Sequence, residues 1–313
     1  MSKLKIQIAF ESGQQIGQGH KSRATALFFE LKKIWDEVYL NPVSELEFET
    51  PDALKKTLYI FDSYLLEPTW LQNFSINHHV LVFDDNYLLA NGEYGIINCN
   101  PYASSEMYSN IKGPKFIGKE YLIVKQEFRP PPPPPTPSER DVLVSMGGAD
   151  IRSLTQPLVK LLKELHLNSL LIIGPDFPET DLKNWKSLAE GSSRIKFLFS
   201  PGPSELQKRF LSSKVILISG GQTAYEALLS GKRPIVIETA ANQKKSIAYL
   251  NHKNLLLESL SWEDPSLYTK LKETLTSLVQ SKDEITRCTP FTNGDGARNL
   301  ALSIVENIEA YGI

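Results

Sequence analysis

Hydrophobic and polar positions follow two different periods along this chain, and each change of period marks an expected strand or helix. Residues 4–10 alternate between apolar and polar side chains as a strand does, whereas residues 24–31 carry apolar side chains at helical spacing. Short β-branched and aromatic runs bounded by polar residues predict further buried strands at residues 37–40, 58–61, 80–83 and 94–98. The first half of the chain is therefore expected to form a parallel sheet covered by helices.

The same rhythm restarts in the second half. Strands are expected to begin near residues 141, 169, 195, 214, 234 and 254, with helical segments after most of them. One helix has an apolar face formed by Ile151, Leu154, Leu158, Leu161, Leu162 and Leu165. Strand–helix units of roughly 20–28 residues are typical of doubly wound parallel sheets. The predicted fold class is α/β, with two Rossmann-like parallel-sheet domains facing across a cleft.

A run of prolines, Pro130–Pro135, separates the two halves. Consecutive prolines adopt the extended polyproline II conformation, so the run is interpreted as a stiff spacer, with a docking site for an aromatic-groove domain as the alternative. The predicted organisation is a first domain over residues 1–128, a linker over 129–140 and a second domain over 141–292. The remaining residues, 293–313, contain a final helix that is expected to reach back to the first domain.

Composition narrows the class of protein. Of 313 residues, 41% are hydrophobic and 22% charged, which is typical of soluble globular proteins, and the net charge of −2 gives no electrostatic reason to expect nucleic acid. The two cysteines, Cys99 and Cys288, match no metal-ligand spacing and suit a reducing compartment. The sequence shows neither a signal-peptide pattern nor an apolar run long enough to span a membrane. We therefore expect a cytoplasmic protein.

The turn after the first strand contains a glycine-rich sequence with a histidine. Gly17, Gly19, His20 and Arg23 lead into a helix, whose exposed N-terminal N–H groups favour anions. A helix N-terminus disfavours a further positive charge, so the imidazole of His20 is expected to be neutral and able to accept a proton. Ser22 takes the place of the third glycine of a dinucleotide-binding fingerprint, which argues against that ligand. A structural histidine is the alternative.

Two glycine pairs follow strands of the second half. Gly147 and Gly148 allow a ligand to approach the backbone, and Asp150 is expected to cap a helix that begins at Ile151. The second pair opens a strand-to-helix turn whose bare N–H groups suit a diphosphate, namely Gly220, Gly221, Gln222 and Thr223. The lysine of a P-loop is missing from this turn, which argues against hydrolysis of a nucleotide γ-phosphate.

Further polar candidates lie close to the second glycine pair. Glu226 follows Gln222 by one helical turn, where a carboxylate can bind the two hydroxyls of a ribose. Asn242 and Gln243 follow another strand end and offer neutral amides to sugar hydroxyls, acetamido groups or phosphate oxygens, with helix capping by Asn242 as the alternative. Since the sequence shows no spaced set of His, Cys and carboxylate side chains, neither a metal nor a cofactor is expected.

These motifs together resemble the GT-B nucleotide-sugar enzymes. Within that group the sequence is most similar to the UDP-sugar hydrolases of pseudaminic acid biosynthesis, which cleave UDP from UDP-2,4-diacetamido-2,4,6-trideoxy-β-L-altropyranose. The matching stretches span nearly the whole chain, at residues 17–23, 62–64, 84–86, 113–116, 126–128, 147–150, 220–226, 241–243 and 293–298. The chain departs from the family pattern in a longer segment over residues 116–122, in Lys125 where arginine is usual, and in the proline run.

The resemblance implies how such a substrate would bind and react. It implies that UDP lies on the second domain, with its diphosphate at Gly220–Thr223 and its ribose on Glu226. It also implies that His20 is the general base for a water that attacks the anomeric carbon, with Tyr64 and Asn242 in contact with sugar or phosphate. Two alternatives stay open: a GT-B glycosyltransferase that uses the same UDP-sugar site with a sugar or lipid acceptor, and a non-catalytic UDP-sugar-binding protein.

The candidate site can be stated residue by residue. His20 is the expected catalytic residue, and no metal ligand is expected. The expected substrate contacts are Gly17, Gly19, Arg23, Tyr64, Gly147, Gly148, Gly220, Gly221, Gln222, Thr223, Glu226, Asn242 and Gln243. The expected partner is a small-molecule UDP-sugar, with no nucleic acid and no membrane span.

Overall fold

The computed structural model describes residues 4–11, 19–46, 57–130, 138–281 and 286–311. The chain divides into two compact units, one formed by Met1–Lys125 with Gly294–Ile313 and the other by Gln126–Asn293. The division falls between Lys125 and Gln126, whereas the sequence placed the end of the first domain at residue 128. Gly17 and the prolines after Pro130 lie outside the described residues.

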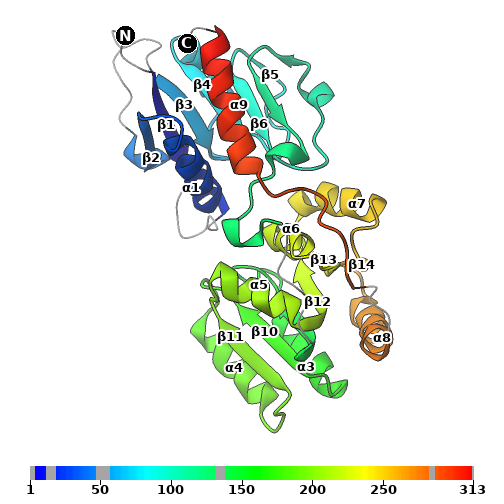
Figure 1. Cartoon of the computed structure of the whole chain (residues 1–313). Coiled ribbons are helices and arrows are strands. Elements are labelled where there is room, and N and C mark those ends of the chain that lie inside the picture. The colour runs from blue at the N-terminus through cyan, green and yellow to red at the C-terminus, as the bar shows by residue number, and fades with distance from the viewer. Residues whose placement is uncertain (1–3, 12–18, 47–56, 131–137, 282–285, 312–313) are drawn as a thin grey trace. The chain divides into compact units, whose positions relative to one another are not determined.

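A six-stranded parallel sheet forms the centre of the first unit, in the order β2-β1-β3-β4-β6-β8 (Figure 1). Its strands are β1 (Lys5–Phe10), β2 (Val38–Pro42), β3 (Thr57–Asp62), β4 (His79–Phe83), β6 (Gly95–Asn98) and β8 (Lys115–Ile117). A two-stranded ladder joins β5 (Asn91–Gly92) to β7 (Asn110–Ile111). The α-helices are α1 (Gly19–Lys32), α2 (Pro68–Ser75) and α9 (Gly296–Tyr311), and the short 3-10 turns are η1 (Val43–Glu45), η3 (Ser105–Tyr108) and η4 (Lys119–Tyr121).

The second unit has its own six-stranded parallel sheet, in the order β11-β10-β9-β12-β13-β14. Its strands are β9 (Arg140–Ser145), β10 (Ser169–Ile173), β11 (Ile195–Phe199), β12 (Ser213–Ser219), β13 (Ile235–Glu238) and β14 (Glu258–Ser261). Its helices are α3 (Thr155–Glu164), α4 (Glu179–Ala189), α5 (Pro203–Leu211), α6 (Gln222–Leu229), α7 (Lys244–His252) and α8 (Leu267–Gln280), with 3-10 turns η5 (Gln126–Phe128) and η6 (Ala241–Gln243). This order is that of the Rossmann fold, whereas the first sheet has the order of the other common doubly wound arrangement, in which the second strand lies outside the first. Each unit is thus a doubly wound parallel sheet, as the α/β fold class predicted.

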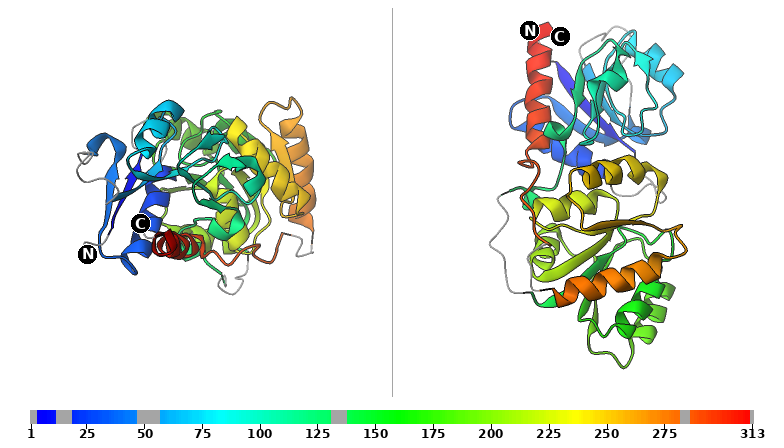
Figure 2. Two further views of the ribbon diagram at one scale, coloured as in Figure 1. Left: turned by 90° about the horizontal axis from the view of Figure 1, so that it is seen from above. Right: turned by 90° about the vertical axis from the view of Figure 1, so that its right-hand side faces the viewer.

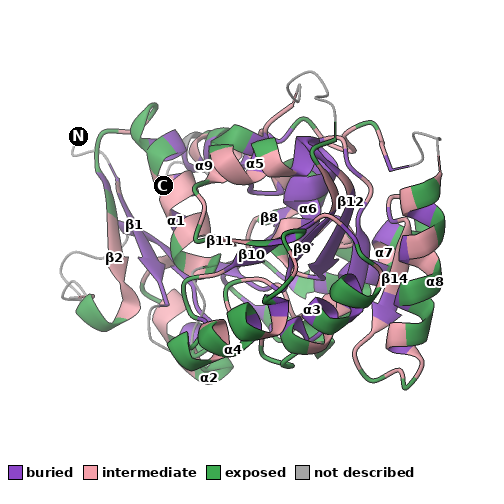
Figure 3. Ribbon diagram, turned by 90° about the horizontal axis from the view of Figure 1, so that it is seen from below, coloured by how far each residue is buried: buried purple, intermediate pink, exposed green. Residues whose placement is uncertain are grey.

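Both sheets are buried on two faces because helices cover each side. Every residue of β3 and of β10 is buried, as expected for parallel strands inside an α/β unit. In Figure 3 the central strands β1 and β12 are purple along most of their length, whereas α4 and α8 show green on their outward sides. The short apolar runs of the sequence therefore correspond to the strands.

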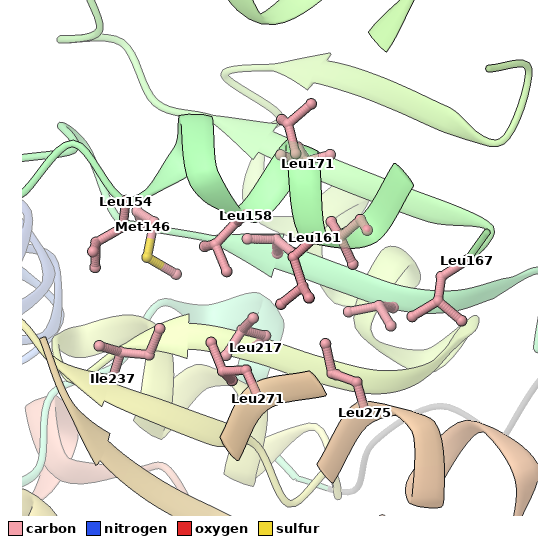
Figure 4. Packing of buried hydrophobic residues seen from close by; sticks show 14 of the residues in the cluster. Met146, Leu154, Leu158, Leu161, Leu167, Leu171, Leu217, Ile237, Leu271 and Leu275 are labelled. Atoms are coloured by element: carbon pink, nitrogen blue, oxygen red, sulfur yellow. The ribbon is translucent and has the colours of Figure 1, made fainter. Parts of the chain in front are cut away.

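The core of the second unit lies between its sheet and two helices from distant parts of the chain. Figure 4 shows Leu158 and Leu161 of α3 on one side of this cluster and Leu271 and Leu275 of α8 on the other. These side chains are almost completely excluded from solvent, and each fully buried leucine contributes roughly 1.5–3 kcal/mol relative to exposure.

The last helix of the chain belongs to the first unit. Figures 1 and 2 show α9 in red beside α1, and the two helices are in contact. Its buried side chains Ala297, Leu300 and Ile304 pack in one core cluster with Leu27 and Leu31 of α1. At its start, Gly296 lies so close to the Leu122 carbonyl that an added Cβ would be 2.1 Å from the oxygen. The first unit is therefore completed by residues that follow the second unit in sequence.

Two expected element boundaries were wrong. The helix predicted from Ile151 begins at Thr155, because Ser153 adopts a left-handed conformation with φ 53° that an α-helix does not accommodate. Ile151, which the apolar pattern had placed on the buried face, is 63% exposed in the preceding turn. The strand expected near residue 254 begins at Glu258, because Asn254 has φ 53° in the turn that ends α7.

Each sheet contains one switch point, where the chain reverses the direction in which it adds strands. In the first unit this point lies between β1 and β3, and in the second between β9 and β12. Open parallel sheets bind ligands outside the carboxyl ends of the strands at such a point. The loop after β1 leads to His20, and the loop after β12 begins at Gly220. The two principal candidate motifs therefore lie at the two switch points.

Among the described helices, none has the length and apolar character needed to cross a membrane.

The position of α9 gives a testable prediction about the first unit. Replacing the buried Leu300 by alanine should destabilise that unit by about 2–5 kcal/mol, because a cavity opens between α9 and α1. Leu302→Ala on the same helix is the matched control, since that side chain is 40% exposed, and should cost less than about 0.5 kcal/mol. Hydrogen exchange of peptides from each unit measures both effects. Faster exchange confined to peptides of the second unit would contradict this placement of α9.

Candidate active site

His20 lies in the first turn of α1, directly beyond the switch point of the first sheet. Its Nδ1 is 2.6 Å from Oδ1 of Asp62, the last residue of β3, and its side chain is 11% exposed. An ionised carboxylate can only accept a hydrogen bond, so Nδ1 carries the proton and Nε2 is the basic nitrogen of the neutral ring. The pair thus has the geometry of a histidine base oriented by an aspartate.

Asp62 is completely buried and makes charge-assisted hydrogen bonds through both oxygens. Arg23 Nη2 donates to Oδ1 at 2.6 Å, and Arg23 Nε donates to Oδ2 at 2.8 Å. Burial alone would raise the pKa of Asp62, but the charge and hydrogen bonds of Arg23, followed by those of His20, hold this pKa below its usual value. The carboxylate is therefore ionised at neutral pH and can act as the acceptor for His20.

Arg23 connects this aspartate to a second one. Its Nη1 donates to both oxygens of Asp85, at 3.0 and 2.8 Å, and its guanidinium carbon lies 4.3 Å from the centre of the Phe83 ring. Burial lowers the pKa of Arg23, and the charges of Asp62 and Asp85 raise it well above its ordinary value. All three guanidinium nitrogens donate to these carboxylates. In the structure Arg23, a predicted substrate contact, is bonded to Asp62 and Asp85.

Tyr64 forms a wall of the site beside His20. The two rings meet edge to face with centroids 4.6 Å apart, and the Tyr64 hydroxyl donates to Asp85 Oδ2 at 2.7 Å. Burial and the charge of Asp85 raise the pKa of Tyr64, so its hydroxyl stays protonated. The backbone N–H of Tyr64 donates to Glu11 Oε2 at 2.7 Å, which fixes this residue from its other end. With 41% of its surface exposed, Tyr64 can contact a ligand.

The sequence had marked the strand ends of the first unit as polar without assigning roles to Asp62, Asp85 or Asn100. Asn100 Nδ2 completes the network by donating to Asp85 Oδ1 at 3.1 Å. The available signal was the position of these residues directly after parallel strands, which places their side chains at one edge of the sheet. What the sequence could not give was the pairing of Asp62 with His20, which are 42 residues apart.

The glycine turns of the second unit lie side by side at its switch point. A Cβ added to Gly147 would be 3.4 Å from Ser219 Oγ, at the end of β12, and Gly147 has the left-handed φ of +89° that favours glycine. Gly220 is closely packed, since an added Cβ would lie 2.7 Å from Ile247 Cδ1. Gly221 is the N-cap of α6, and a Cβ added to it would meet no atom within 4 Å, so no neighbouring atom crowds the N-terminus of that helix at this position.

The side chains around this turn differ in how accessible they are. Gln222 is exposed and Thr223 half-buried at the start of α6, whereas Glu226 is only 3% exposed. The Glu226 carboxylate expected to bind a ribose thus lies inside the unit. Asn242 is exposed, and the Gln243 Oε1 accepts a hydrogen bond from the Thr239 N–H at 2.8 Å. Capping by Asn242, the alternative considered from the sequence, is not what the structure shows.

Arg152 is a cationic residue at this edge that the sequence reasoning did not single out. Its Nε donates to the Thr239 carbonyl at 2.9 Å, and its guanidinium carbon lies 4.0 Å from the centre of the Trp262 ring. These contacts join the loop after β9 to the loops after β13 and β14. Asp150 fixes the same loop, because its two oxygens accept the N–H groups of Leu154 and Thr155 at 2.9 and 2.6 Å.

Among the described residues, no group of three or more His, Cys, Asp and Glu side chains is arranged to hold a metal ion. The described parts of the two candidate sites therefore offer different chemistry. The first unit presents an oriented imidazole, and the second presents backbone N–H groups at a helix N-terminus, which suit an anionic ligand.

Comparison with known proteins gives one curated relative and a set of similar folds. No protein-family model matches the chain. UDP-2,4-diacetamido-2,4,6-trideoxy-β-L-altropyranose hydrolase of Campylobacter jejuni is 23% identical, over 82% of this chain and 99% of that protein.

Solved structures of similar fold cover nearly the full length of both chains compared, and two of them serve as examples. MurG of Acinetobacter baumannii superposes with a TM-score of 0.55 and 12% identity over 97% of this chain and 99% of its own. The UDP-GlcNAc 2-epimerase of Methanocaldococcus jannaschii, solved with UDP-GlcNAc and UDP, superposes with a TM-score of 0.56 and 10% identity over 97% and 99%. The chain thus has the GT-B fold and is similar along most of its length to a UDP-sugar hydrolase.

Proposed function

We propose that this protein hydrolyses a UDP-linked 2,4-diacetamido-2,4,6-trideoxy hexose, releasing UDP by attack of water at the anomeric carbon. We further propose that the reaction serves nonulosonic, pseudaminic-type sugar or surface polysaccharide biosynthesis. The observation that carries the proposal is the hydrogen bond of 2.6 Å between His20 Nδ1 and the buried Asp62. The similarity to the altropyranose hydrolase supports the substrate class.

His20 is proposed to act as the general base. Its Nε2 removes a proton from water as the water oxygen forms a bond to the anomeric carbon. The bond between that carbon and the leaving oxygen breaks, and its electron pair stays on the β-phosphate of UDP. Asp62 stabilises the imidazolium that forms, because its carboxylate stays ionised and accepts a hydrogen bond from Nδ1–H throughout the reaction. General-base assistance of this kind accelerates a reaction by roughly 10²–10⁴-fold.

The second unit is proposed to bind the UDP leaving group. Gly221 leaves the first turn of α6 open, and the N–H groups of Gln222 and Thr223 point toward the helix N-terminus. These donors and the helix dipole would stabilise the negative charge that grows on the diphosphate. Gly147, Gly148, Asn242 and Gln243 are proposed to border the same site, and Gly17, Gly19 and Tyr64 the sugar side. The reaction is proposed to need no metal and no cofactor.

A UDP-release assay tests the reaction class. With UDP-2,4-diacetamido-2,4,6-trideoxy hexoses of altro and gluco configuration, we expect UDP and free sugar to appear in equal amounts in buffer without an acceptor. Coupled UDP detection and mass spectrometry of the sugar measure both products. Release that requires an added sugar or lipid acceptor would instead identify a glycosyltransferase. Stoichiometric binding of the UDP-sugars without any release would identify a binding protein.

Substitutions at the His20–Asp62 pair test the assignment of the base. His20→Ala should lower kcat by about 10²–10⁴-fold, and Asp62→Asn by on the order of 10²-fold or more, because the amide does not favour the Nδ1–H tautomer or stabilise the imidazolium. Both variants should retain the UDP affinity of the native protein, as measured by calorimetry. Lys21→Ala, at an exposed neighbouring position, is the matched control and should retain full activity. A His20→Ala variant with native kcat would refute the role of His20.

Metal removal tests the proposed absence of Lewis-acid assistance. Dialysis against a chelator should leave kcat unchanged within about twofold, because the leaving diphosphate is stabilised by backbone donors and the helix dipole. The measurement is UDP release before and after dialysis. Loss of turnover in chelator that added Mg²⁺ or Mn²⁺ restores would show that a metal ion takes part.

A further inference from the structure

We propose that Arg23 is a positioning residue that holds His20 in its neutral, proton-accepting form by sharing the Asp62 carboxylate with it, and that Asp85 limits this effect. The role of His20 as base rests on the proposed function. The balance of charge among His20, Asp62, Arg23 and Asp85 does not rest on the proposed function, because it concerns the protein without substrate. The charges next to His20 would thus determine the pH range in which it can act as a base.

The shared oxygen is the starting point. Asp62 Oδ1 accepts from His20 Nδ1 and from Arg23 Nη2, each at 2.6 Å, and Asp62 Oδ2 accepts from Arg23 Nε at 2.8 Å. A buried aspartate such as Asp62, paired with His20 alone, would strongly favour the positively charged imidazolium. The Arg23 guanidinium already balances the negative charge of Asp62. The carboxylate therefore still orients the Nδ1–H of His20 but favours protonation of Nε2 less strongly.

Asp85 opposes the effect of Arg23. Both of its oxygens accept from Arg23 Nη1, and the side chain is 16% exposed. The Tyr64 hydroxyl and the Asn100 amide donate to the same carboxylate, which fixes it against the guanidinium. Charges therefore alternate outward from the imidazole, in the order Asp62 negative, Arg23 positive and Asp85 negative. Removing each charge in turn should change the protonation of His20 in a direction set by its sign.

The other groups that face the site are uncharged or already bonded. The Tyr64 hydroxyl next to His20 stays protonated, and burial raises the pKa of the Cys99 thiol near Arg23, which keeps it neutral. Glu11, at the end of β1, accepts from the Ser63 hydroxyl and from the Tyr64 N–H.

The chain around His20 adds few further charges. Lys21 follows it on α1 and is exposed. Residues 12–18, which precede α1, contain no titratable side chain in the sequence. Asp84, next to Asp85, has both oxygens bonded to the backbone N–H groups of Leu88 and Leu89. Asp62, Arg23 and Asp85 are therefore the charges expected to control the imidazole.

A purely structural role for Arg23 makes a different prediction. As a cross-link between the ends of β3 and β4, it would affect stability when replaced, with no ordered effect on His20. The charge model predicts opposite changes for Arg23→Gln and Asp85→Asn, although both remove one side of the same salt bridge. The direction of change therefore separates the two roles.

The test is an NMR titration of the histidine rings in the full-length protein without substrate, with His20→Gln used to assign the His20 signals among the five histidines. In Arg23→Gln the His20 ring should remain protonated to a pH higher by on the order of one unit than in the native protein. In Asp85→Asn it should lose its proton at a lower pH. Arg23→Lys, which keeps the charge, should shift less than Arg23→Gln. Lys33→Gln, at an exposed position in the turn after α1, is the matched control and should leave the titration unchanged.

Shifts of the same sign in Arg23→Gln and Asp85→Asn, or no shift in either, would overturn the proposal. If Arg23→Gln does not fold, as judged by circular dichroism, Asp85→Asn decides alone: a downward shift supports the proposal, and an unchanged or upward titration overturns it. These spectra need no turnover, so failure of the proposed hydrolysis is a separate outcome. If hydrolysis holds, the acidic limb of the kcat profile should move in the same direction as the titration in each variant.

Discussion

The buried carboxylate of Asp62 is the constraint on which the candidate active site depends. An ionised side chain without solvent contact is stable only when it is paired and hydrogen-bonded. Here the partners are Arg23 and His20, both from the start of α1. The charge of one residue at the end of β3 therefore fixes the start of α1, the helix that follows β1, in space. It also determines which nitrogen of His20 carries the proton.

The parallel-sheet topology explains why the candidate residues gather where they do. In both units the loops that leave the two strands at the switch point diverge, and candidate residues lie in or next to those loops. The first unit uses this position to hold charged side chains, and the second uses it to expose a helix N-terminus after Gly221. One backbone arrangement thus gives a proton acceptor in one unit and an anion-binding turn in the other. Helix α9 completes the core behind the first site, next to α1.

The sequence allowed the fold to be predicted more completely than the site. Buried parallel strands carry a local signal, since each is a short apolar run between polar residues, and these runs correspond to the observed strands. The errors at Ile151 and Asn254 come from left-handed residues nearby, which periodicity does not detect. For the site, the glycine turns and His20 were evident because they are local motifs. The use of Arg23 within the protein and the burial of Glu226 depend on contacts with distant segments, which composition and spacing do not reveal.

The central claim is that an imidazole oriented by Asp62 activates water for attack on the anomeric carbon of a UDP-sugar. Hydrolysis in water enriched in ¹⁸O, followed by mass spectrometry of both products before the sugar exchanges its anomeric oxygen, tests this most directly. The label is expected in the released sugar, and UDP should remain unlabelled. Label in the β-phosphate of UDP would show that water attacks phosphorus, which would contradict the proposed chemistry.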